Sequence, residues 1–109
     1  MKRIGSLMLV LALLLAVGPV AAFAAEWTGV ITETHCGAAH KAGTEKDIQC
    51  IKECVSDGRG KLALLVDNDV FTITNPDQAT GHEGHKVTVV GTADNTAKTV
   101  TIESLTMAS

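Results

Sequence analysis

The chain has 109 residues, and its 9 Lys and Arg against 12 Asp and Glu give a formal net charge of −3. A chain this short builds one domain around one small core, for which a disulfide or metal ion would be a useful staple. The acidic balance argues against nucleic-acid binding, which depends on Lys and Arg neutralising phosphates. One Trp, two Phe and no Tyr are also too few to stack bases.

The first residues have the pattern of a secretory signal peptide. A basic start is followed by an apolar run over residues 4–17, and Ala22-Phe23-Ala24 fits the small-x-small rule for cleavage. The apolar run is shorter than the ~20 residues that span a bilayer, so no stable membrane anchor is expected. We therefore expect removal of residues 1–24, leaving residues 25–109 as a single periplasmic or secreted domain.

The first strand is predicted directly after this leader. Residues 27–33 are rich in β-branched side chains that roughly alternate with other residues, which is typical of a strand. The cysteine- and histidine-containing segment follows at once. Residues 37–43 are small and irregular in pattern, and they predict a loop.

A helix is predicted after this loop, over residues 45–56. Thr44 is a suitable N-cap, and Asp47 lies three residues further on, where a capping box has its acidic partner. Apolar residues then recur at helical spacing until Gly58 ends the pattern.

The rest of the chain predicts four more strands separated by turn residues. The first two of them should form a hairpin around Asp67, Asn68 and Asp69. Between the second and third, Asn75 and Pro76 favour a short helical turn. The four strands are expected over residues 61–66, 70–74, 86–92 and 98–105.

This order of elements predicts a mainly β fold. Five short strands, with a helical turn between the third and the fourth, match a small five-stranded OB-like barrel. The predicted helix would then be an insert after the first strand. An open five-stranded sheet with the helix packed on one face is the alternative.

The motif Cys36-Gly37-x-x-His40 follows the predicted first strand, and Cys50-x-x-x-Cys54 lies on the predicted helix. In these motifs the chain resembles a group of small exported bacterial proteins of unestablished function. Members of that group have a Cys-Gly-x-x-His segment after the first strand, a helix with two further cysteines, and an OB-like C-terminal part. The resemblance implies this architecture and export. A Tyr that is often found after the helix in the group is replaced here by an apolar run. The matching residues are Trp27, Gly29, Ile31, Thr34, Cys36, Gly37, His40, Cys50, Cys54, Gly84, Val87, Val89 and Gly91.

The candidate functional site is the segment from His35 to Cys54, which contains all three cysteines. An odd number of cysteines in an exported protein leaves one sulfur outside any disulfide. Cys50 and Cys54 are four residues apart on the predicted helix, so their side chains share one face. Soft thiolates select zinc or Cu(I), and we expect a binding protein that holds such an ion through Cys36, Cys50 and Cys54 with His40 or His35.

A disulfide is the alternative at the same residues. Export favours it, and a bond between Cys36 and Cys54 is weakly preferred over one between Cys36 and Cys50. It would close a loop of about 19 residues and stabilise the protein by roughly 3 kcal/mol. Cys50 would then be a spare thiol beside His40, free to pair with a partner protein. Thiol-redox activity is a third option, although the Cys-x-x-Cys motif is absent.

A second, weaker candidate is the segment His82-Glu83-Gly84-His85. Two imidazoles three residues apart could bind a divalent metal, but the spacing is one residue shorter than in the zinc-protease motif. Solvated loop histidines are the simpler interpretation. These histidines join the first cluster only if the fold brings their loop over the end of the first strand.

Overall fold

The computed structural model describes residues 24–108. The predicted signal peptide and its cleavage site therefore lie outside the described residues, except for Ala24 and Ala25. The elements are, in chain order, β1 (Ala25–Glu33), η2 (Gly37–His40), α2 (Glu45–Ser56), β2 (Leu62–Val66), β3 (Asp69–Ile73), η3 (Pro76–Gln78), β4 (Lys86–Asp94) and β5 (Thr99–Met107).

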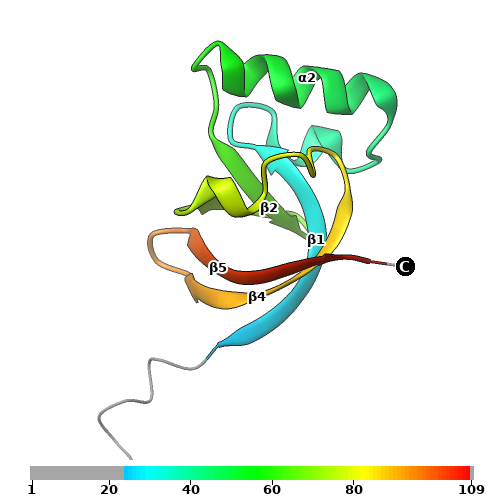
Figure 1. Cartoon of the computed structure of the whole chain (residues 1–109). Coiled ribbons are helices and arrows are strands. Elements are labelled where there is room, and N and C mark those ends of the chain that lie inside the picture. The colour runs from blue at the N-terminus through cyan, green and yellow to red at the C-terminus, as the bar shows by residue number, and fades with distance from the viewer. Residues whose placement is uncertain (1–23, 109) are drawn as a thin grey trace, which may run out of the picture.

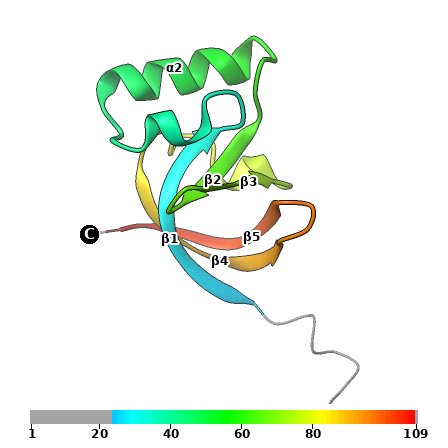
Figure 2. The same cartoon turned by 180° about the vertical axis from the view of Figure 1, so that it is seen from behind.

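The five strands form one mixed sheet that closes in a ring, in the order β1-β2-β3-β5-β4, with β4 pairing back to β1 (Figures 1 and 2). All pairs are antiparallel except β3 with β5. The mainly β prediction is confirmed, and the open sheet that we considered as an alternative is not found.

The strand β1 makes the closure possible because it changes partners along its length. Its residues up to Val30 pair with β4, and its residues from Val30 onward pair with β2. Gly29 lies at this change, where a Cβ atom would collide with the carbonyl oxygen of Leu65. Gly91 plays the same part at an irregularity in the β4–β5 pairing, where a Cβ atom would collide with the carbonyl oxygen of Thr101. Glycine permits both close approaches of backbone, which bend the strands into the ring.

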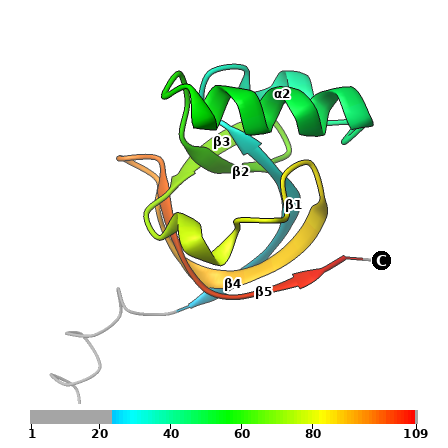
Figure 3. The same ribbon diagram turned by 45° about the horizontal axis from the view of Figure 1, so that its top comes forward.

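The helix α2 lies across one end of the ring (Figures 1 and 3). It begins as predicted, with a capping box in which the Thr44 hydroxyl accepts from the Asp47 N–H and the Asp47 carboxylate accepts from the Thr44 N–H. Its bounds match the predicted residues 45–56. None of the helices among residues 24–108 is long and apolar enough to cross a membrane.

Two stripes on α2 face two different parts of the protein. Ile51 is fully buried in the core, and Ile48 packs against Gly84 of the loop before β4. The stripe formed by Asp47, Cys50 and Cys54 is rotated away from these residues and meets the η2 segment. The helix therefore covers the core with one stripe and carries the candidate site on the other. The buried core consists of Ile31, Ile51, Leu62, Leu64, Ile73, Ala79, Val87, Val89, Val100 and Ile102.

The predicted strands all form, and only their bounds differ. The β2–β3 hairpin turns at Asp67 and Asn68, with Asp67 in the left-handed backbone region at φ 57°. β4 and β5 extend beyond the predicted ranges because they pair with each other over most of their lengths. The predicted helical turn is the short 3-10 helix η3, and part of the predicted loop at 37–43 is the 3-10 helix η2.

Substitution of Ile51 should destabilise the fold strongly. Ile51→Ala removes a fully buried side chain from the contact between α2 and the ring. It should lower the free energy of unfolding by about 2–5 kcal/mol, measured by urea denaturation. Lys52→Ala, at the exposed neighbouring position, is the matched control and should change stability little. An equal loss in both variants would show that α2 is not anchored through Ile51.

Candidate metal centre

The end of β1, the η2 segment and one stripe of α2 lie side by side (Figure 2). One ligand atom each from Cys36, His40 and Cys50 lies within 4.8 Å of the other two. Within residues 24–108 this is the one such group of three or more His, Cys, Asp or Glu side chains, and it could hold a metal ion.

Glu33 organises the chain around this group. Its side chain is fully buried at the end of β1, although it is a carboxylate. It accepts hydrogen bonds from the backbone N–H groups of His35, at 2.6 Å, and Cys36, at 3.0 Å. Gly60 leaves room for it, because a Cβ atom there would collide with Oε1 of Glu33. The buried carboxylate thereby fixes the start of the segment that contains Cys36.

His40 is held between two carboxylates. Its side chain is nearly buried, with Nδ1 3.0 Å from Oδ1 of Asp47 and Nε2 3.2 Å from Oε2 of Glu33. Each ring nitrogen of His40 therefore faces a carboxylate oxygen. The contact with His40 is also the main reason that the pKa of Asp47 lies below its usual value, with the hydrogen bond to the Thr44 backbone second.

The three cysteines are free thiols that differ in burial: Cys36 is exposed, Cys50 is half-buried and Cys54 is buried. Cys50 lies close enough to both Cys36 and Cys54 to influence their pKa values, and Cys36 also lies close to the carboxylate of Glu33. Desolvation first, and the negative charge of Glu33 second, raise the pKa of both Cys36 and Cys54. A reactive catalytic cysteine has the opposite shift, toward a lower pKa.

The structure brings together only part of the predicted ligand set. Cys36, His40 and Cys50 form the group, while Cys54 contacts Cys50 but lies outside it. His35 also lies outside the group and contributes its backbone N–H to Glu33. The disulfide that we considered between Cys36 and Cys54 is not formed, and Cys50 lies close to both of these residues.

His82 and His85 pack against each other and not against the first cluster. Their rings meet edge to face with centroids 5.7 Å apart, and the buried Nδ1 atom of each has no hydrogen-bond partner among the described residues. Their loop does reach β1, because Ile31 exchanges backbone hydrogen bonds with His85 and Gly84. The loop therefore lies along the strand, but neither histidine belongs to the group around Cys36.

Glu33 and Asp47 are parts of this site that the sequence analysis did not identify as such. A signal for Glu33 was present, since it shares a strand face with the buried Ile31 in the alternating pattern of β1. An acidic residue on the inward face of a strand requires hydrogen-bonding partners, and the residues that follow it supply them. Asp47 was assigned only to the helix cap, where one of its oxygens does bond Thr44.

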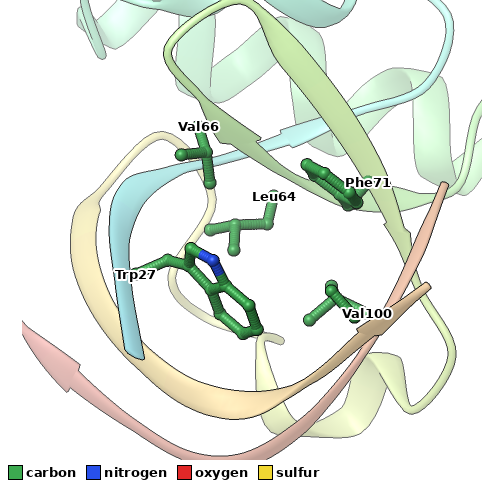
Figure 4. Close-up of a pocket in the computed structure, with 6 residues that line it drawn as sticks. Trp27, Leu64, Val66, Phe71 and Val100 are labelled. Carbon is green, nitrogen blue, oxygen red and sulfur yellow. The ribbon is translucent and has the colours of Figure 1, made fainter. Parts of the chain in front are cut away.

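The interior of the ring has too little free space for an organic ligand. Figure 4 shows the indole of Trp27 pointing into a pocket between Leu64 and Val100. The remaining space is about 10 Å³, which is at the lower limit for one water molecule. The apolar lining of this pocket is therefore part of the core.

Comparison with known protein families, with characterised proteins and with solved structures gives no match to this chain.

The lowered pKa of Asp47 predicts how stability depends on pH. A carboxyl whose pKa is lower in the folded state stabilises the fold above its unfolded pKa, and this contribution is lost as the pH falls through the folded value. The stability difference between the wild type and Asp47→Asn should therefore be full above about pH 4 and shrink in more acidic solution. Urea denaturation with a chelator present, from pH 6 to pH 3, measures it. A constant difference would contradict the prediction, and Glu53→Gln, at an exposed carboxylate of the same helix, is the control.

Proposed function

We propose that this protein is an exported binding protein that holds a soft metal ion, zinc or Cu(I), through Cys36, Cys50 and His40. The observation that carries the proposal is the convergence of two sulfurs and one imidazole nitrogen within 4.8 Å, from two separate elements. Thiolate and imidazole ligands together are preferred by zinc and copper among biological metals.

The surroundings of His40 support this assignment. Histidines that ligate metals almost always donate the other ring N–H to a carboxylate, which fixes the tautomer and the ring orientation. Asp47 is placed for this role at Nδ1 of His40, at 3.0 Å. Metal binding at Nε2 would replace the contact with Glu33 that this nitrogen makes at 3.2 Å.

Cys54 has a supporting role in the proposed site. It lies close to Cys50 and is almost fully buried, at 1% exposure. A bound metal ion would take Cys36 and Cys50 as thiolates, releasing their protons. Cys54 would then stabilise the Cys50 thiolate as a hydrogen-bond donor.

We further propose that the ring is an OB-like barrel in a member of the group that the chain resembles. The strand order, the single parallel pairing of β3 with β5 and the helical turn η3 between β3 and β4 support this. Periplasmic or secreted location is proposed from the leader-like residues 1–24.

Intact mass of the protein isolated from the exported fraction tests the metal proposal. We expect one bound metal under native conditions, lost on denaturation, and three cysteines that all react with an alkylating agent. One reactive cysteine without metal would instead identify a disulfide-stapled structural or interaction module with a spare thiol. That result would overturn the metal-binding proposal.

Cysteine substitutions should distinguish ligands from neighbours. Loss of a residue that only hydrogen-bonds a metal ligand typically weakens metal binding 10–100-fold, so loss of a ligand in Cys50→Ser should weaken zinc binding more than about 100-fold. Cys54→Ser is the matched variant one helical turn away and should stay within about 100-fold of the wild type. Competition with a chromophoric chelator measures both. Equal losses would place Cys54 among the ligands, as in the four-ligand set expected from the sequence.

A further inference from the structure

The Glu33 side chain is fully buried, and both of its oxygens accept backbone N–H groups, as those of a carboxylate do. Among residues 24–108, the one basic side chain in contact with it is His40, at 3.2 Å, and His40 is shared with a second carboxylate, Asp47. Arg59 is half exposed and bonded to Asp57 at 3.0 Å. A fully buried charge needs close compensation, so this end of the protein favours a cation.

Metal binding would increase the negative charge around Glu33. Ligating cysteines are thiolates, and a ligating histidine is neutral. Cys36, Cys50 and Glu33 would then carry three formal negative charges in one partly buried site. A divalent ion leaves one of them uncompensated, and a monovalent ion leaves two.

We propose that Glu33 shifts the metal preference of this site toward a divalent ion, zinc, relative to Cu(I). The inference rests on the metal-binding function proposed above and concerns the charge of the ion that the site favours. The attraction of a fixed carboxylate for a cation scales with the charge of the cation, so Glu33 attracts Zn²⁺ twice as strongly as Cu⁺ at equal distance. Burial strengthens this difference because little water screens it.

The position of Glu33 allows this effect without its being a ligand. Its Oε2 atom lies 3.0 Å from the backbone nitrogen of Cys36 and 3.2 Å from Nε2 of His40. Its negative charge also helps to raise the pKa of the Cys36 thiol, after desolvation. The carboxylate is therefore adjacent to two of the three proposed donors.

Competition titrations of the reduced protein test the proposal, with Zn²⁺ and Cu(I) each measured against a chromophoric chelator in the absence of oxygen. Glu33→Gln keeps one acceptor oxygen and removes the charge. It should lose at least about tenfold more affinity for Zn²⁺ than for Cu(I). Glu53→Gln, exposed on α2, should leave both affinities unchanged.

A second variant tests the charge argument if Glu33→Gln does not fold. Arg59 is positively charged, lies within electrostatic reach of Cys50 and Cys54, and is half exposed. Arg59→Gln should therefore fold normally and shift the ratio of affinities toward Zn²⁺. Circular dichroism of each variant establishes that the fold is retained.

The outcomes separate this inference from the proposed function. If the wild type binds neither ion, the metal-binding function fails, and the inference fails with it. If the wild type binds metal but folded Glu33→Gln loses both affinities equally, Glu33 has only a structural role and selectivity is overturned alone. If Glu33→Gln is unfolded, an unchanged ratio in Arg59→Gln overturns it, and a ratio shifted toward Zn²⁺ supports it.

Discussion

Polar contacts from Glu33 through His40 to Asp47 join β1, η2 and α2 to one another. Glu33 belongs to β1, His40 ends η2, and Asp47 lies in the first turn of α2. Asp47 also completes the cap of the helix with Thr44. The direction of the helix, the course of the loop and the position of the thiols therefore depend on one buried carboxylate.

This arrangement explains how so short a helix serves both the fold and the site. Residues at 48 and 51 pack toward the ring and its covering loop, and residues at 47, 50 and 54 meet the η2 segment. The two sets are offset by about one residue, a rotation of roughly 100° around the helix axis. A change that shifts α2 along the core must also move Cys50 relative to Cys36.

The apolar interior of the ring and the polar groups between β1, η2 and α2 have separate roles. Inside the ring, Trp27 and its apolar neighbours leave almost no free space (Figure 4). The thiols, imidazole and carboxylates gather outside it, between β1, η2 and α2. One half of the domain supplies stability, and the other supplies a small set of donors that suits an ion.

Local signals in the sequence determined the helix bounds, the five strands, the β2–β3 hairpin and the shared face of Cys50 and Cys54. Each of these depends on residues a few positions apart, such as Thr44 with Asp47 or Asp67 with Asn68. Only the tertiary structure decided which donors meet. Cys36 and Cys50 are fourteen residues apart in different parts of the fold, so no periodicity relates them. His35 and His40 are equally good candidates in the sequence, and only the structure shows that His35 bonds Glu33 through its backbone N–H. Ring closure likewise depends on β1 meeting β4 across most of the chain. The packing of the whole core selects such non-local contacts. For this reason the burial of Glu33, and the position of Cys54 outside the group of Cys36, His40 and Cys50, appear only in the fold.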